Sequence, residues 1–250
     1  MNFEPRWYRK QMDSERFVSF NVEYLESDLW IGIDKDSFSK DIQSFSFEKI
    51  KSYRQQLDKY ILTCPIFRNS LAPLQFDPKA PEIARDMIIQ SQNSGTGPMA
   101  CVAGAFANWL GTDIMKNFNP KELIIENGGD IFTLCKNDLK VAVYAGDSPL
   151  SGKIGILIPP EFTPLGVCTS SGTVGPSLSF GKSDATMIVC KNAALADGYA
   201  SFFGNQVKHP DGIHSILESI SKVPEIISAI IVCEDKFGIN GKFNLEIIKS

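Results

Sequence analysis

Residues 123–158 read LIIENGGDIFTLCKNDLKVAVYAGDSPLSGKIGILI and decide the fold class. The stretch consists of short apolar runs with high β-propensity, and Asn, Asp and Gly residues separate these runs. Such runs predict an antiparallel meander, because Asn-Gly pairs favour the tight turns of hairpins. Further along, residues 185–190 predict one more strand, and residues 227–235 and 242–248 predict a hairpin with residues 236–241 as its connection.

Apolar residues at helical spacing occur on both sides of these strands. Ser44 or Ser46 would cap the first helix, and the run Met99–Leu110 contains no charged residue, so its helix should lie in the interior. Because helical and strand-forming segments are segregated along the chain, the predicted class is α+β. The predicted helices cover residues 47–63, 82–92, 98–111, 193–207 and 211–222, and those at 98–111 and 193–207 should pack on sheets built from residues 123–190.

The N-terminal part of the chain is predicted to form a layer on this core. Residues 17–33 alternate in the way of a hairpin with one face in a core. Together with the first helix, the hairpin makes residues 1–75 an N-terminal hairpin-plus-helix layer. The stretch Pro73–Pro81 is too short for a linker, so we expect a single domain over residues 1–250.

The composition is that of a globular protein. Of 250 residues, 43% are hydrophobic and 22% are charged, and 25 basic against 29 acidic residues give a net charge of -4. This charge balance does not indicate binding to nucleic acid or to an acidic membrane. The N-terminus lacks the apolar region of a signal peptide, and no segment approaches the roughly 18 uninterrupted apolar residues of a membrane span, so we expect a cytoplasmic protein.

Six cysteines and two histidines limit the metal chemistry. The cysteines form no Cys-x-x-Cys pair, which argues against a zinc site and against a dense disulfide framework. Reduced thiols are therefore expected. His209 and His214 flank a Pro-Asp-Gly turn and are expected to face solvent, and their number excludes a site with three histidines.

The segment Cys168–Gly181 is rich in small polar residues, since six of its fourteen residues are Ser or Thr and three are Gly. Hydroxyl and accessible backbone N–H groups could bind phosphate oxygens without a fixed positive charge. Most segments of this composition are solvated loops. We favour the binding role, because four apolar residues should anchor the segment: Val167, Val174, Leu178 and Phe180. The candidate binding residues are Thr169, Ser170, Ser171, Gly172 and Thr173.

The turn Asn127–Asp130 is a second candidate, because two backbone amides and a carboxylate could face a ligand there. Taken alone, an Asn-Gly pair between two apolar runs favours a plain hairpin turn. Gly95 and Gly97 precede the apolar helix, and an anion could bind at the N-terminus of that helix. No Walker A loop or Gly-x-Gly-x-x-Gly fingerprint accompanies either segment.

Asp197 and Ser201 lie four residues apart on the predicted helix 193–207. Their oxygens therefore leave the same face of the helix and could share one hard cation such as Mg²⁺. An equally good alternative places Asp197 in the first turn of this helix, where its charge interacts with the helix dipole.

Two cysteines could carry chemistry. Cys168 lies beside the hydroxyl-rich segment and Cys101 lies near the start of a helix, where a thiol with a lowered pKa could act as nucleophile or sulfur carrier. Most unpaired cysteines behave as small buried hydrophobic residues, and we favour that interpretation for both Cys168 and Cys101.

Five segments of the sequence resemble an uncharacterised, ApbE-like family of archaeal and bacterial cytoplasmic proteins. The match spans nearly the whole chain, and Thr-Ser-Ser-Gly-Thr-Val-Gly at 169–175 is its most specific motif. The resemblance implies an ApbE-like fold, related to the T-fold, with mixed or antiparallel sheets flanked by helices. The segments are CPIFRNSLAPL (64–74), GPMACVAGAFAN (97–108), ENGGDIF (126–132), GVCTSSGTVGPSLSFGKSDA (166–185) and AALADGYASFFGN (193–205).

A more distant resemblance is to the FAD:protein FMN transferases, which cut FAD with a bound magnesium ion and pass FMN to a Ser or Thr of a target protein. It implies a magnesium site at Asp197 and Ser201, the positions of the Asp and Thr in the metal-holding helix of those enzymes. It also implies that two segments lie near the flavin nucleotide. Their residues are Asn127, Gly128, Gly129 and Asp130 in the turn, and Thr169, Ser170 and Gly172 in the loop.

The sequence departs from the transferase pattern at three places. The interval between the Thr-Ser-Gly and Ala-Asp motifs holds neither the histidine nor the Asp-Pro-x-Thr-Gly segment of the transferases. Pro176 stands where some family members carry His, and Ser201 replaces Thr. These departures concern the transfer reaction more than the shared fold.

We therefore expect a magnesium-assisted enzyme, of the metal-dependent transferase type, that binds FAD, FMN or another phosphorylated small molecule. Its candidate catalytic residues are Asp197 and Cys168. The alternative, which also follows from the resemblance, is an accessory or sulfur-transfer protein of anaerobic sulfur assimilation and homocysteine formation. That role would make Cys168 or Cys101 the important residue and leave Asp197 structural.

The protein partner that the sequence suggests is a second copy of the chain, in a homodimer. Phe202 and Phe203 are adjacent, so on a helix they point about 100° apart and cannot share one narrow core stripe. One of them would then face an interface or the ligand pocket. The alternative is that the flanking sheets cover both rings.

Overall fold

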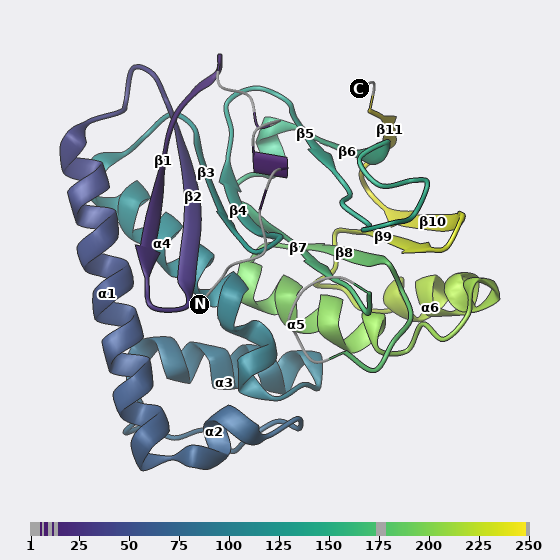
Figure 1. Cartoon of the computed structure of the whole chain (residues 1–250), viewed down its shortest axis with the longest axis horizontal. Coiled ribbons are helices and arrows are strands. Elements are labelled where there is room, and N and C mark those ends of the chain that lie inside the picture. The colour runs from purple at the N-terminus through teal and green to yellow at the C-terminus, as the bar shows by residue number, and fades with distance from the viewer. Residues whose placement is uncertain (1–5, 7, 10–11, 13–14, 174–178, 249–250) are drawn as a thin grey trace.

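A computed structural model of the chain describes residues 6, 8–9, 12, 15–173 and 179–248. Within these residues two antiparallel sheets and a set of helices build the predicted α+β fold (Figure 1). The larger sheet contains, in spatial order, β1 (Phe17–Tyr24), β2 (Ser27–Asp34), β3 (Leu123–Asn127), β4 (Asp130–Leu134), β7 (Leu165–Ser170), β8 (Ala185–Cys190), β9 (Ser228–Cys233) and β10 (Lys236–Gly241). The smaller sheet contains β11 (Leu245–Ile247), β6 (Ile154–Ile158) and β5 (Leu139–Ala142).

Helices cover one face of the larger sheet, and the smaller sheet covers part of the other (Figure 1). As predicted, the two helices richest in small residues pack on the central strands, one on β3 and β4 and the other on β7 and β8. No helix in the described part of the chain is long and apolar enough to cross a membrane. The helices are α1 (Lys40–Thr63), α2 (Pro65–Asn69), α3 (Glu82–Ser94), α4 (Val102–Phe118), α5 (Ala193–Gly204) and α6 (Ile213–Ile220).

Strand β8 shows why the sheet is buried on both faces. All six of its residues are buried, and successive side chains point to opposite faces. Ile188 and Cys190 pack with α5 and α6, whereas Met187 and Val189 pack with the smaller sheet. A strand with cores on both sides is continuously apolar, as ATMIVC is.

The N-terminal hairpin is confirmed, and it extends the larger sheet because β2 also pairs with β3. Helix α1 begins earlier than predicted, at Lys40 with Ser39 as its N-cap residue. Ser46 is buried inside the helix, where its hydroxyl group donates a hydrogen bond of 2.7 Å to the carbonyl oxygen of Ile42. The buried Ile42 adds one more turn to the apolar face, so the helix extends beyond the predicted serine caps.

The uninterrupted meander predicted over residues 123–158 is wrong after β4. The next neighbour of β4 in the sheet is β7, because β5 and β6 leave to form the smaller sheet. Glu122 stabilises this departure, since its Oε1 accepts hydrogen bonds from the backbone N–H groups of Lys136 and Asn137 at 2.9 and 3.0 Å. The chain therefore turns away from the larger sheet directly after Cys135.

The predicted C-terminal hairpin is also wrong. Residues 236–241, expected as a connection, are strand β10, and β9 pairs with it across a tight turn in which Glu234 has a φ of 58°. β11 instead pairs with β6. β10 is an edge strand with mostly exposed or half-buried residues, so its sequence carries little of the apolar pattern by which strands are predicted.

Candidate functional site

The turn between β3 and β4 has two glycines at its centre. Gly128 and Gly129 have φ values of 69° and 101°, a backbone region that favours glycine. Gly128 is exposed, and Gly129 approaches the carbonyl oxygen of Thr169 at the end of β7. The hairpin turn that the sequence predicted is therefore present, and it lies against the hydroxyl-rich segment.

Side chains at both ends of this turn bind neighbouring elements. Nδ2 of Asn127 donates a hydrogen bond of 3.0 Å to the carbonyl oxygen of Ala103, at the start of α4. Oδ1 of Asp130 accepts a hydrogen bond of 3.3 Å from the backbone N–H of Thr169. The turn, the beginning of α4 and the end of β7 consequently meet at one place.

Asp197 reaches the same place from α5. Its Oδ2 atom accepts a hydrogen bond of 3.0 Å from the backbone N–H of Gly104, in the first turn of α4, and the N–H of Ala103 also stabilises the carboxylate. Burial nevertheless raises the pKa of Asp197 to about 7, against the effect of these two N–H groups. Asp197 therefore interacts with the N-terminus of α4 rather than with that of its own helix.

The small residues of α4 and α5 make this approach possible. A Cβ atom on Gly104 would collide with the carbonyl oxygen of Ala193, and one on Gly198 would collide with Ser94. Helix α5 can thus pack closely against the start of α4 and against the end of α3. Gly95, which ends α3 with a φ of 76°, and Gly97 do not frame an open anion site, because the first N–H groups of α4 bind the protein's own Asp197.

Asp130 and Asp197 form a pair of buried carboxylates. Burial raises the pKa of Asp130 well above its ordinary value, and the charge of Asp197 raises it further. The N–H of Thr169, which donates to Asp130, and the nearby thiol of Cys168 lower this pKa. Two such groups do not both ionise readily at neutral pH in the absence of a cation.

The two candidate cysteines are both buried. The thiol of Cys168 lies 3.1 Å from the carbonyl oxygen of Ala193, to which it donates, and burial together with the charge of Asp130 raises its pKa well above the ordinary value. Burial also raises the pKa of Cys101. Both thiols are thus protonated near neutral pH, whereas a nucleophilic or sulfur-carrying role needs a thiolate. That role stays a prediction.

The hydroxyl-rich segment divides into two parts. Thr169 and Ser170 belong to β7 and are half-buried beside the turn. The hydroxyl group of Thr173 instead donates a hydrogen bond of 2.9 Å to Asp184, and the N–H of Gly172 donates to the carbonyl oxygen of Ser183 at 2.8 Å. Gly172 and Thr173 are therefore bound to the residues that directly precede β8.

The predicted anchoring of the segment is wrong at Phe180. Its side chain is 57% exposed, whereas Val167 is buried as expected. Val174, Pro176 and Leu178 lie outside the described residues. Ser171 is half-buried between the two parts of the segment.

The sequence did not point to Glu126, which connects the turn to the N-terminal part of the chain. Its Oε1 atom accepts hydrogen bonds of 2.8 Å from both the Gly129 N–H and the Tyr8 hydroxyl, and its Oε2 pairs with Nε of Arg9 at 2.6 Å. One of the two turn amides that could have faced a ligand is therefore used internally.

Asp28 completes this network, since Arg9 and Arg6 pair with its carboxylate at 2.8 and 3.2 Å. The contacts of Glu126 with Tyr8 and Arg9 join residues more than a hundred positions apart, and nothing in the local sequence around Arg9 marks them. Burial, followed by the charge of Glu126, raises the pKa of Tyr8. The N-terminal residues Arg6, Tyr8 and Arg9 are therefore part of the structure around the turn.

Ser201 lies one helical turn after Asp197 and is half-buried. In the part of the chain that the structure describes, no three His, Cys, Asp or Glu side chains come together as metal ligands. The oxygens that could serve a cation here are those of two carboxylates and a hydroxyl group, which suit a hard ion such as Mg²⁺.

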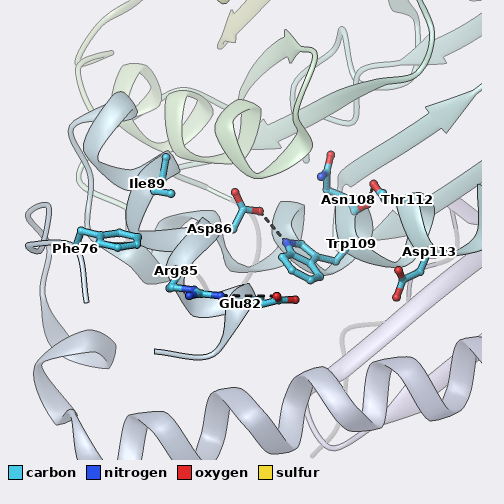
Figure 2. A pocket seen from close by; sticks show the side chains of 9 residues that line it. All are labelled: Phe76, Glu82, Arg85, Asp86, Ile89, Asn108, Trp109, Thr112 and Asp113. Atoms are coloured by element: carbon cyan, nitrogen blue, oxygen red, sulfur yellow. Dashed lines mark hydrogen bonds and ion pairs between the residues drawn. The ribbon is translucent and has the colours of Figure 1, made fainter. Parts of the chain in front are cut away.

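A separate cavity of about 520 Å³ lies between α3 and α4. Figure 2 shows Trp109 in its wall, with Nε1 donating a hydrogen bond of 2.8 Å to Asp86. None of the binding or catalytic residues predicted from the sequence lines this cavity. Its lining consists of Phe76, Glu82, Arg85, Asp86, Ile89, Asn108, Trp109, Thr112 and Asp113.

The aromatic pair on α5 is split between core and surface. Phe203 is buried, whereas Phe202 is 37% exposed, in keeping with their different directions on the helix. His214 is exposed on α6, as expected, and lies 3.2 Å from Glu218.

The fold is that of the ApbE flavin transferases. The apo form of the Pseudomonas stutzeri flavinyl transferase ApbE matches with a TM-score of 0.59 and 13% identity, over 92% of this chain and 96% of that chain. The flavin transferase ApbE from Vibrio cholerae matches with a TM-score of 0.52 and 11% identity, over 89% of this chain and 96% of that chain. At such low identity the likeness shows the fold alone.

The chain belongs to the family whose model is described as AbpE bacteria and matches residues 9–219. The UPF0280 protein MJ1526 of Methanocaldococcus jannaschii is 37% identical over 230 residues, which cover 90% of this chain and 91% of that protein. A UPF0280 protein of Methanocella arvoryzae is 35% identical over 195 residues, 78% of this chain and 79% of that protein. The ApbE-like family expected from the sequence motifs is confirmed.

Proposed function

We propose that this protein binds a flavin nucleotide, or another phosphorylated small molecule, together with a magnesium ion at the site around Asp197. The observation that carries the proposal is the pair of buried carboxylates, Asp130 and Asp197. In the described residues neither carboxylate forms an ion pair with a cationic side chain. Perturbed, buried groups of this kind are concentrated at functional sites.

The oxygens near this pair fit a hard divalent cation. The ion would be held by Asp197, with the Ser201 hydroxyl and Asp130 as further oxygen donors. Bound there, it would neutralise the negative charge of a phosphate group. Thr169 and Ser170 would donate hydrogen bonds to the ligand from the end of β7, and the exposed glycine turn would let the ligand approach the backbone.

The fold shared with flavin transferases supports a flavin nucleotide as the first ligand to test, namely FAD or FMN. A metal-dependent transferase reaction is the enzymatic form of the proposal. Standard FMN transfer is not assigned, because the interval between Thr173 and Asn192 contains neither the histidine nor the Asp-Pro-x-Thr-Gly stretch of the transferases.

Thermal unfolding with FAD, FMN and riboflavin, each with and without Mg²⁺, tests this function. A ligand at 100 times its dissociation constant stabilises the folded state by about 2.7 kcal/mol, which gives a clear rise in Tm. We expect FAD or FMN to raise Tm and Mg²⁺ to increase the rise. Asp197→Asn should remove the increase due to Mg²⁺. No stabilisation by any nucleotide at millimolar concentration would exclude the proposal.

The alternative function is an accessory or sulfur-transfer role in anaerobic sulfur assimilation. It requires Cys168 or Cys101 as a thiolate, and the burial of both thiols disfavours it. Replacing Cys168 by Ser and Asp197 by Ala separates the two functions. Loss of pathway activity in the cysteine variant, with an unimpaired Asp197 variant, would favour sulfur transfer, and the reverse result would favour the nucleotide enzyme.

A homodimer remains part of the proposal through Phe202, whose exposed ring lies on the helix that carries Asp197. Light scattering measures the mass directly. A mass of one chain at all concentrations would remove the dimer.

A further inference from the structure

Arg6 lies beside the glycine turn between β3 and β4. Its Nη2 atom is 3.4 Å from the position that a Cβ atom would take on Gly128, and Gly128 is exposed. The turn Asn127–Asp130 contains no basic residue, and neither does the segment 168–173. Arg6 therefore brings a positive charge to a part of the site that has none of its own.

The two arginines of this N-terminal segment use their donors differently. Arg9 directs Nε to Glu126 and both terminal nitrogens to Asp28. Arg6 binds Asp28 through Nη1 alone, 2.6 Å from its carbonyl oxygen and 3.2 Å from Oδ2. Within the described residues the Nη2 group of Arg6 donates to no acceptor, and 21% of the side chain is exposed.

We propose that Arg6 binds a phosphate group of the ligand at the glycine turn and so selects phosphate and pyrophosphate esters over uncharged molecules. This inference rests on the function proposed above. A guanidinium group combines charge with a planar fork of donors, which matches phosphate oxygens. The hydroxyl groups at the end of β7 add donors without charge, so Arg6 supplies the electrostatic part of the recognition.

The ion pairs around Arg6 allow this second role. Arg9 already pairs with Asp28 at 2.8 Å and with Glu126 at 2.6 Å. Asp28 therefore stays compensated when Arg6 turns its free amino group toward an anion. Leaving a buried carboxylate without a partner would be costly, and Arg9 avoids that cost.

Titration calorimetry of the full chain tests the role of Arg6 with four probes: pyrophosphate, ADP, FAD and riboflavin. Mg²⁺ is kept at one concentration throughout. The variants are Arg6→Gln, Arg6→Lys and the control Arg85→Gln, which removes a half-exposed arginine beside the separate cavity of Figure 2. Circular dichroism of each variant checks that the fold is kept.

We expect Arg6→Gln to weaken the binding of pyrophosphate, ADP and FAD at least tenfold, while riboflavin binds equally to all variants. Arg6→Lys should recover part of the loss, because a lysine keeps the charge without the planar fork. Arg85→Gln should bind every probe as the unchanged protein does.

The outcomes separate this inference from the proposed function. Equal FAD affinity in the unchanged protein and in Arg6→Gln overturns the role of Arg6 and leaves the nucleotide function standing. An Arg6-dependent loss of pyrophosphate and ADP binding, with no preference for FAD, supports Arg6 and overturns a flavin-specific site. Binding of none of the three phosphate probes to the unchanged protein overturns both.

Discussion

Two groups of buried carboxylates lie near strand β3, and their charges are compensated in different ways. Glu122 pairs with Arg16 at 2.6 Å, Glu126 pairs with Arg9 at 2.6 Å, and Asp28 pairs with Arg9 as well as Arg6. Asp130 and Asp197 have only N–H groups and a thiol as described partners. The first group is matched by arginines from the N-terminal part of the chain, and the second is not.

The difference shows in the direction of the pKa shifts. Burial acts to raise the pKa of Glu122, but Arg16 and two backbone N–H groups lower it to about 2. The same burial, opposed only by N–H groups, raises the pKa of Asp197 to about 7. A buried carboxylate without a cation is costly for folding. Such a cost is typical of a position that is kept for binding rather than for stability.

The largest effect is expected for Arg9→Ala. This change leaves Glu126 and part of Asp28 buried without their main partner, and breaking a buried ion pair in this way costs about 3–5 kcal/mol. Chemical denaturation at pH 7 measures the loss of unfolding free energy. Lys121→Ala is the control, because the Lys121–Asp36 pair is exposed and its loss should leave the stability unchanged. Equal effects of the two changes would contradict the comparison.

The local part of the fold could be predicted from the sequence. Apolar periodicity placed the hairpin at residues 17–33 and the helices near residues 98–111 and 193–207, because these patterns are set by neighbouring residues. The departure of β5 and β6 into a second sheet could not be predicted, since pairing depends on distant segments. The edge strand β10 was missed because its solvent-facing residues carry a weak pattern.

The residues of the candidate site could likewise be predicted only in part. The helix that carries Asp197 and the glycine turn at 127–130 could be located from local motifs. No local motif indicates that Asp197 meets the first turn of α4, or that Glu126 joins the turn to Arg9. These contacts span 93 and 117 positions, and long-range pairs of this kind require the folded chain. The functional roles of the site residues stay predictions.

A smaller effect, with the opposite sign, is expected for Asp197→Asn in the absence of divalent cations. The folded-state pKa of Asp197 is raised above the ordinary value of 3.8 to about 7, so the unchanged protein loses stability as pH rises from about 4 to 7. The amide cannot ionise. The variant should therefore be more stable above pH 7, by a few kcal/mol, and equal to the unchanged protein below pH 4.

Urea denaturation at pH 4, 6 and 8 measures this dependence. Added Mg²⁺ should stabilise the unchanged protein at pH 8 and leave Asp197→Asn unaffected. A variant that is less stable than the unchanged protein at pH 8 would show that Asp197 belongs with the arginine-matched carboxylates.

Glu122→Gln tests a pKa shift of the opposite direction, whose effect on stability appears at acidic pH. The folded-state pKa of Glu122 lies at about 2 against an ordinary 4.5, so its ionised form stabilises the protein above pH 4.5, and this stability is lost as pH falls toward 2. The variant should lose about 2 kcal/mol at pH 7, the typical contribution of hydrogen bonds to a charged group. The difference should vanish near pH 2 in the same denaturation assay. A constant difference across this range would instead point to lost packing.

The smallest effect is expected for Gly128→Ala, and it tests whether the turn is more than a hairpin. Gly128 has a φ of 69°, and an alanine in this region costs about 1 kcal/mol of stability. Gly152 is a matched control, because its φ is 72° and no atom lies within 4 Å of where its Cβ would be. Both alanine variants should thus lose similar stability in urea denaturation.

Ligand binding should distinguish the two glycine variants. The new methyl group at position 128 would lie 3.4 Å from Nη2 of Arg6, the group that donates to no acceptor among the described residues. It would therefore obstruct a phosphate at the turn, whereas Gly152→Ala leaves that place unchanged. We expect several-fold weaker pyrophosphate and FAD binding in Gly128→Ala only. If both variants bind these probes as the unchanged protein does, the turn serves the hairpin alone and takes no part in ligand binding.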